Sequence, residues 1–285
     1  MNKILVPTDF STCANNAVNF AVQTAKYLSV KVTLLHSFEQ SDNMYTNYVG
    51  LDKEYTRLLL HDVNEKMDQL AKSIKDTEGI EVDTLISGAS LEDAITTVSA
   101  EKGIDLVVMG TLGATGLREM FWGSKTASLI DKTTVPLMVI PYEYAWKKPV
   151  NFLLTTNHFE DDPAILNYLF EMIKLYSGKL EVVTFSDEDY DESHTRNERA
   201  GKLRDYEVKL KETYGDDALT TTKLHGTEFE ETLQEHIKKN DIDILAMVTY
   251  HQSKNFFYRL FNSSITKRMS YHTEIPLLVI PGEVK

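Results

Sequence analysis

A glycine-rich segment in the first half of the chain carries the residue types best suited to chemistry. Four of the chain's 13 glycines lie between positions 110 and 123. Gly110 follows the apolar run 106–109, and a glycine there lets a ligand approach the backbone closely. Gly113 can adopt a positive φ, which lets successive N–H groups point into one concavity. Gly123 directly precedes Ser124, where a helical pattern begins and offers unpaired N–H groups.

This arrangement is typical of a phosphate-binding loop, since the N–H groups and the helix dipole both favour an anion. The side chains after the last glycine add donors, namely the hydroxyls of Ser124 and Thr126 and the ammonium group of Lys125. An ordinary glycine-rich turn with Ser124 as N-cap has the same residues. The spacing alone leaves both interpretations open.

Short apolar runs alternate with amphipathic stretches, and this order predicts parallel strands joined by right-handed helical crossovers. In the first half the expected strands are 4–7, 32–36, 82–86, 104–110 and 137–140. Ligands of such doubly wound sheets sit at the carboxyl ends of the strands, at the switch point. The candidate loops therefore follow the first strand, where Asp9 lies, and the fourth strand. We favour a ligand contact for Asp9 over a general base, a metal ligand or a plain turn residue.

The chain contains an internal repeat. The run 105–109 recurs at 243–247, 135–141 recurs at 275–281, and Gly88 recurs as Gly226. We therefore predict two tandem domains, 1–143 and 149–285, joined near a short segment that contains Pro149.

Composition excludes several classes of partner. The net charge of −13 disfavours nucleic acid and anionic membrane surfaces. The single cysteine, Cys13, excludes internal disulfides and multi-cysteine metal sites, and no other metal-ligand spacing is present. The apolar run at the N-terminus is too short for a signal peptide, and no stretch is long enough to span a bilayer. We expect a cytoplasmic protein.

The glycine spacing, with Gly110, Gly113 and Gly123-Ser124, resembles the ATP-binding motif of the universal stress protein family. The resemblance extends to the opening run 4–11 with Asp9, to 34–37, to the Gly88 loop and to 135–140. It implies two tandem Rossmann-like α/β domains, similar to adenine nucleotide alpha hydrolases, each a five-stranded parallel sheet of order 3-2-1-4-5. It also implies that ATP or AMP binds, alone or with Mg²⁺, with adenosine near Asp9 and Ser37. Carried over position by position, the nucleotide-binding residues are Pro7, Thr8, Asp9, Ser37, Met109, Gly110, Gly113, Gly123, Ser124, Lys125 and Thr126.

The second copy departs from this motif. Asn157 replaces Asp9, and Val248, His251 and Ser263 replace Gly110, Gly113 and Gly123. A β-branched residue blocks backbone approach, and a non-glycine residue disfavours positive φ, so we expect a degenerate site.

Three functions remain open from the sequence. The first is a nucleotide-responsive regulatory or protective stress protein that uses the first half. The second is a slow ATPase or phosphotransferase at the same site, although no complete hydrolytic motif is present and we assign no catalytic residue. The third is a nucleotide-free scaffold that binds a protein or a hydrophobic ligand through the second half.

The last strands of the two copies, 137–140 and 277–280, are apolar throughout and are expected at sheet edges. An uncovered apolar edge is an aggregation hazard. Single-domain members of the family dimerise through this strand, and the resemblance suggests that the tandem chain forms the same contact internally, as a pseudo-dimer. A homodimer of two chains is an additional possibility.

Overall fold

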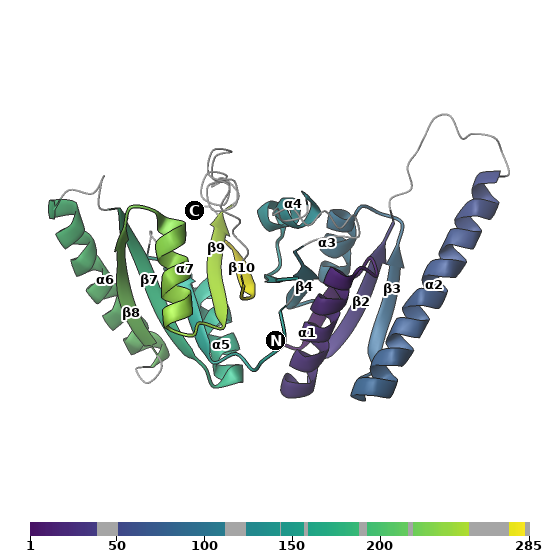
Figure 1. Ribbon diagram of the computed structural model, residues 1–285, viewed down its shortest axis with the longest axis horizontal. Helices are drawn as coiled ribbons and strands as arrows, with labels where there is room; N and C mark the ends of the chain where they lie inside the picture. The colour runs from purple at the N-terminus through teal and green to yellow at the C-terminus, as the bar shows by residue number, and fades with distance from the viewer. Residues whose placement is uncertain are drawn as a thin grey trace. The chain divides into compact units, whose positions relative to one another are not determined.

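The structure is a computed structural model with two compact units, Met1–Trp146 (unit 1) and Lys147–Lys285 (unit 2) (Figure 1). It describes residues 1–38, 51–111, 124–142, 144–156, 159–187, 193–215, 219–250 and 274–282. Within these ranges no helix combines the length and the apolar content needed to cross a bilayer.

Unit 1 is a parallel five-stranded sheet of order β3-β2-β1-β4-β5, as the family resemblance implies. β1 is buried because the run 4–6 is entirely apolar, and α1 packs on β1 and β4 through its apolar stripe. Ser11 begins α1 by accepting a hydrogen bond from the N–H of Ala14. The elements are β1 (Lys3–Pro7), α1 (Thr12–Leu28), β2 (Lys31–Ser37), α2 (Leu51–Glu78), β3 (Val82–Ser87), α3 (Leu91–Lys102), β4 (Leu106–Gly110), α4 (Ser124–Lys132) and β5 (Leu137–Ile140).

Unit 2 repeats this topology, with parallel strands in the order β10-β9-β6-β7-β8. Its first strand again occupies the middle of the sheet, so the switch point lies between β6 and β9. The elements are β6 (Asn151–Thr155), α5 (Pro163–Tyr176), β7 (Lys179–Asp187), α6 (Ser193–Tyr214), β8 (Leu219–Gly226), α7 (Phe229–Lys239), β9 (Ile244–Tyr250) and β10 (Leu277–Gly282).

The repeated aspartate at the start of the fourth strand has the same structural role in both units. In unit 1, Asp105 Oδ2 accepts hydrogen bonds from the N–H groups of Asn2 and Lys3, at 2.6 and 3.0 Å. In unit 2, Asp243 Oδ2 accepts from Val150 and Asn151, at 2.8 and 2.9 Å. The carboxylate therefore anchors the entry of the central strand to its neighbour, a structural rather than a catalytic reason for this repeat.

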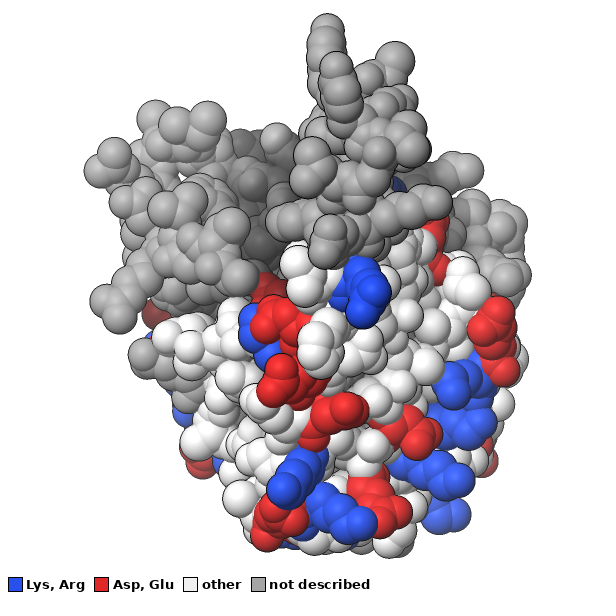
Figure 2. All heavy atoms as spheres, turned by 90° about the vertical axis from the view of Figure 1, so that its right-hand side faces the viewer, with Lys and Arg blue, Asp and Glu red and all other residues white. Residues whose placement is uncertain are grey.

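The face of unit 1 that carries α2 shows acidic and basic side chains intermixed over its described part (Figure 2). Lys75 pairs with Glu81 at 2.7 Å and Lys26 pairs with Glu78 at 2.9 Å. Such exposed pairs contribute little to stability, because solvent screens them. Their effect is to divide the surface charge of this face into small neutral groups.

Candidate functional site

The loop after β1 forms one wall of the predicted site. The N–H of Thr8 donates to the Leu35 carbonyl at 2.8 Å, which continues the pairing of β1 with β2 by one residue. Thr8 is buried, and its Oγ1 accepts from the N–H of Phe10 at 3.1 Å. Asp9 is exposed, and its Oδ1 accepts from the N–H of Ser11 at 3.0 Å. The loop is thus a tight turn in which the Asp9 carboxylate accepts from the backbone two residues later.

Phe10 adopts a left-handed backbone conformation, with φ of 62°, which is unfavourable for a residue with a bulky side chain. Its ring stacks on His36, with centroids 5.0 Å apart and an interplanar angle of 23°. His36 Nδ1 lies 2.8 Å from the carbonyl oxygen of Thr8. The sequence reasoning missed this pair, although a histidine at the end of the second strand was a usable signal.

Ser37 ends β2 at the same edge of the sheet. Its Oγ donates to the Ala89 carbonyl at 2.7 Å, and Ser87 Oγ accepts from the N–H of Ala89 at 3.2 Å. The first of these bonds connects the end of β2 to the loop after β3, and the second forms a turn at the start of that loop. The Ser37 hydroxyl is therefore engaged by the backbone, and the side chain resembles an apolar residue more than its type suggests.

Gly110 ends β4 beside Met109, and both are buried. A Cβ atom at Gly110 would lie 2.6 Å from both the carbonyl oxygen and the Sγ of Cys13. The glycine is thus required because the start of α1 packs directly on β4. The sequence suggested that Gly110 leaves room for a ligand. The contact shows instead that the glycine leaves room for Cys13. Cys13 is buried in the same contact, with its Sγ 3.7 Å from Thr111 Oγ1.

The start of α4 is tied to the end of β4. Thr126 is buried, and its Oγ1 donates to the Gly110 carbonyl at 3.2 Å. This bond brings the first turn of α4 to the carboxyl edge of the sheet. Gly113 and Gly123 lie outside the described residues, as do the side chains of Ser124 and Lys125. Of the predicted residues, the structure therefore brings Pro7, Thr8, Asp9, Ser37, Met109, Gly110 and Thr126 to one edge.

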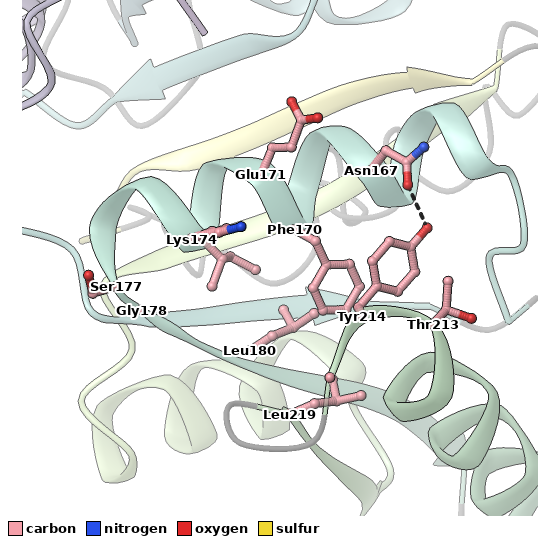
Figure 3. Close-up of a pocket in the computed structure, with 12 residues that line it drawn as sticks. Asn167, Phe170, Glu171, Lys174, Ser177, Gly178, Leu180, Thr213, Tyr214 and Leu219 are labelled. Atoms are coloured by element: carbon pink, nitrogen blue, oxygen red, sulfur yellow. Dashed lines mark hydrogen bonds between the residues drawn. The ribbon is translucent and has the colours of Figure 1, made fainter.

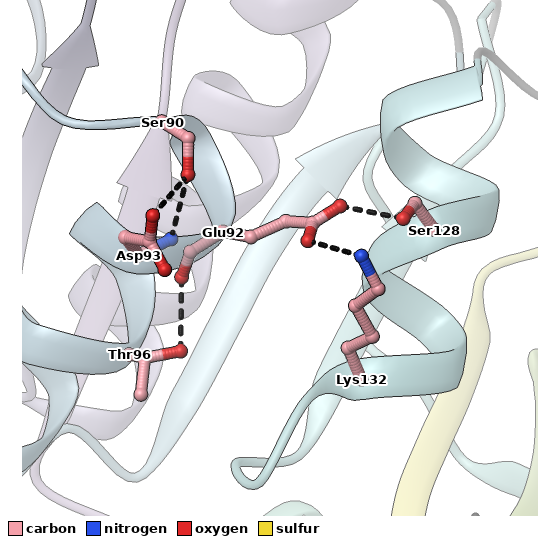
Figure 4. A network of polar contacts seen from close by, with 6 residues as sticks. All are labelled: Ser90, Glu92, Asp93, Thr96, Ser128 and Lys132. Atoms are coloured by element: carbon pink, nitrogen blue, oxygen red, sulfur yellow. Dashed lines mark hydrogen bonds and ion pairs between the residues drawn. The ribbon is translucent and has the colours of Figure 1, made fainter.

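A polar network holds α4 against α3 (Figure 4). Glu92 accepts from Ser128 Oγ at 2.5 Å and from Lys132 Nζ at 2.6 Å. The Lys132 bond, then the Ser128 bond, lowers the pKa of the Glu92 carboxyl below its ordinary value. Ser90 caps α3 by accepting from the N–H of Asp93 at 3.2 Å. The network fixes the helix that follows the glycine segment in sequence, and the sequence patterns did not reveal it because its members are 36 and 40 positions apart.

The buried carboxylate of Glu160 accepts hydrogen bonds at the switch point of unit 2. Glu160 Oε1 accepts from the N–H of Asp162 at 2.7 Å, and its Oε2 accepts from the hydroxyl of Tyr250. Tyr206 donates to the Glu160 carbonyl at 2.6 Å and packs edge-on against Phe159. Burial is the main cause that raises the pKa of both Tyr206 and Tyr250. The charge of Glu160 raises the pKa of Tyr206 further, and the hydrogen bond to Glu160 does the same for Tyr250, so both hydroxyls stay protonated donors.

An anion is disfavoured beside this buried carboxylate, because like charges repel strongly where water is scarce. Val248 lies within β9 in place of Gly110, while Asn157, His251 and Ser263 lie outside the described residues. The degeneracy of the second site stays a prediction, and the Glu160 carboxylate is the described feature that favours it.

An open groove of about 620 Å³ lies elsewhere in unit 2, between α5 and the end of α6 (Figure 3). Phe170 and Tyr214 stack in its wall, with centroids 4.0 Å apart, and the Tyr214 hydroxyl donates to Asn167 Oδ1 at 2.9 Å. Leu180 and Leu219, near the starts of β7 and β8, also line it. It lies at the amino ends of these strands, away from the switch point, and includes none of the residues predicted from the sequence.

The sequence of unit 1 matches a known protein family. Residues 1–141 match the family described as the universal stress protein family. The chain belongs to this family through its first unit. Universal stress protein MJ0577 of Methanocaldococcus jannaschii is 28% identical over 152 residues, which cover 48% of this chain and 93% of the relative. Universal stress protein YxiE of Bacillus subtilis is 24% identical over 145 residues, which cover 49% of this chain and 98% of the relative.

A solved universal stress protein from Archaeoglobus fulgidus has the same fold over nearly the whole length. It superposes with a TM-score of 0.69, covers 98% of each chain and is 14% identical in sequence. This likeness extends the universal stress protein fold to unit 2, where the sequence signal is weak. The tandem arrangement of two such folds, predicted from the internal repeat, is thereby confirmed.

Proposed function

We propose that this universal stress protein binds ATP or AMP, alone or with Mg²⁺, in unit 1 and acts as a nucleotide-responsive protein in the stress response. The observation that carries the proposal is the bond from Thr126 Oγ1 to the Gly110 carbonyl. It holds the first turn of α4 beside the end of β4, near the Asp9 loop. The family motif expects the phosphates at this helix start, where unpaired N–H groups and the helix dipole would favour an anion.

The roles within the site are those that the family resemblance implies. Asp9 and the end of β2 would receive the nucleoside, and Ser37 would present its methylene because its hydroxyl is bonded to Ala89. The glycine segment, Ser124 and Lys125 would hold the phosphates. We further propose that unit 2 has no nucleotide site of its own, since Glu160 supplies negative charge at its switch point.

The full chain is expected to bind one ATP or AMP molecule, and Gly113→Val is expected to weaken binding at least about 30-fold. Micromolar affinity corresponds to about −8 kcal/mol, and a 30-fold loss corresponds to about 2 kcal/mol. The physical reason is that valine disfavours the positive φ that the motif requires. Calorimetric titration with ATP, with and without Mg²⁺, and with AMP measures both the affinity and the number of sites.

The matched control is His251→Val, which places the same residue at the corresponding position of unit 2. It is expected to leave affinity and stoichiometry unchanged. Two sites per chain, or equal affinity in the wild type and Gly113→Val, would contradict the proposal. Sustained phosphate release that disappears in Asp9→Asn would instead favour the ATPase alternative.

We also propose that β5 and β10 cover each other as the edge strands of a pseudo-dimer within one chain. Leu137–Ile140 and Leu277–Ile280 are fully apolar, and each occupies the end of its unit's strand order. Amide hydrogen exchange of the full chain tests this arrangement. The N–H groups of β5 that point away from β4 are expected to exchange as slowly as those bonded to β4. Fast exchange of this set alone would show an open edge and refute the pairing.

A further inference from the structure

We propose that His36 is a positioning residue that holds the Asp9 loop in the conformation needed for nucleotide binding. The inference rests on the proposed function, but its structural part concerns the ligand-free loop alone. It starts from the observation that the ring of His36 makes two contacts with this loop. One contact is the hydrogen bond to the Thr8 carbonyl and the other is the stack on Phe10.

The hydrogen bond determines the tautomer of the histidine. A carbonyl oxygen can only accept, so Nδ1, 2.8 Å from the Thr8 carbonyl, must carry the proton. In the neutral ring the other nitrogen, Nε2, is then an acceptor. Whenever the His36 ring is neutral, this hydrogen bond therefore requires the Nδ1–H tautomer.

The loop needs such a support because its backbone is strained at one position. Phe10 has φ of 62°, and its N–H is bonded to Thr8 Oγ1 at 3.1 Å. His36 contacts the residue on either side of Asp9, namely the backbone of Thr8 and the ring of Phe10. Moving the His36 ring would therefore change the direction in which Asp9 presents its carboxylate.

The second unit provides an internal comparison. The strand registers place Thr184 where unit 1 has His36, since Thr155 pairs with Val183 as Pro7 pairs with Leu35. Thr184 Oγ1 is buried and has no hydrogen-bond partner among the described residues. Phe159 also has a positive φ, of 52°, but its ring packs on Tyr206. The histidine support is thus present in the unit with the nucleotide motif and replaced in the unit with the degenerate motif.

Three substitutions separate the hydrogen bond from the ring. His36→Asn keeps a donor near the place of Nδ1, His36→Phe keeps a ring without a donor, and His36→Thr copies unit 2. We expect His36→Phe and His36→Thr to weaken ATP binding at least about tenfold and His36→Asn to stay within about threefold of the wild type. Thr184→Val is the control and should change neither property measured.

The second readout is independent of nucleotide. In the ligand-free full chain, the ¹⁵N spectrum of His36 should show the Nδ1–H tautomer at pH 8. Exchange of the Phe10 N–H should be at least about tenfold faster in His36→Phe and His36→Thr, and near the wild-type rate in His36→Asn. An Nε2–H tautomer, or equal Phe10 exchange in all variants, would overturn the proposal. If the wild type binds no ATP while the exchange differences appear, the proposed function fails and the role of His36 in holding the loop stands.

Discussion

Gly110→Val is expected to lower the free energy of unfolding by about 3 kcal/mol or more, at the upper end of the usual cost of overpacking. Its Cβ would lie 2.6 Å from the Cys13 carbonyl oxygen, a backbone atom that moves only if the start of α1 moves. Because α1 packs on both β1 and β4, such a shift disturbs the centre of unit 1. Urea denaturation of the full chain, followed by circular dichroism, measures the loss.

The control for this variant is another glycine with free space around it. Gly201 lies within α6 without a positive φ, and a Cβ atom there would have no described neighbour within 4 Å. Gly201→Ala should therefore stabilise the protein by roughly 0.5–1 kcal/mol, because alanine favours the helix. Equal stability of Gly110→Val and the wild type would show that α1 does not approach β4 as closely as described. Adding Cys13→Ala to Gly110→Val should recover only part of the lost stability, since it removes the Sγ contact and leaves the carbonyl contact.

Asp243→Ala is expected to cost about 2–3 kcal/mol at pH 7. The substitution leaves the N–H groups of Val150 and Asn151 without their acceptor, and each such loss costs about 1–3 kcal/mol when water is excluded. The Asp243 side chain is 7% exposed, whereas its ion-pair partner Lys147 is 56% exposed. The ion pair therefore adds little, and Lys147→Met, the control, should cost less than about 1 kcal/mol.

The pH dependence of this loss has a definite sign. Burial raises the pKa of Asp243, but the hydrogen bonds from Lys147, Asn151 and Val150 together outweigh burial and hold it below 3.8. Its contribution is thus fully present above the unfolded value and is lost as pH falls through the lower folded value. The stability gap between wild type and Asp243→Ala should be constant from pH 7 to 5 and narrow below pH 3.8. A gap that grows on acidification would contradict the lowered pKa.

The sequence by itself determined the tandem organisation of the chain and the parallel pairing of its strands, whereas the strand order of each unit was implied by the resemblance to the universal stress protein family. Repeated apolar runs, such as 106–109 and 244–247, indicate buried strands directly, and the alternation with helices leaves few topologies possible. The placement of Asp9, Ser37 and Gly110 at one edge follows from that topology, because the carboxyl ends of parallel strands lie on the same side. The family resemblance rested on the glycine spacing together with the opening strand, 34–37, the Gly88 loop and 135–140.

Only the tertiary structure decided what individual side chains do at that edge. Position 110 requires glycine because a side chain there would collide with Cys13. His36 supports the Asp9 loop, and Glu160 supplies the negative charge at the switch point of unit 2. These contacts join residues far apart in the chain, and their geometry depends on how closely each helix packs on its sheet. Hydrophobic periodicity fixes which face of an element is buried, but the depth of that packing depends on side-chain shapes from several elements at once.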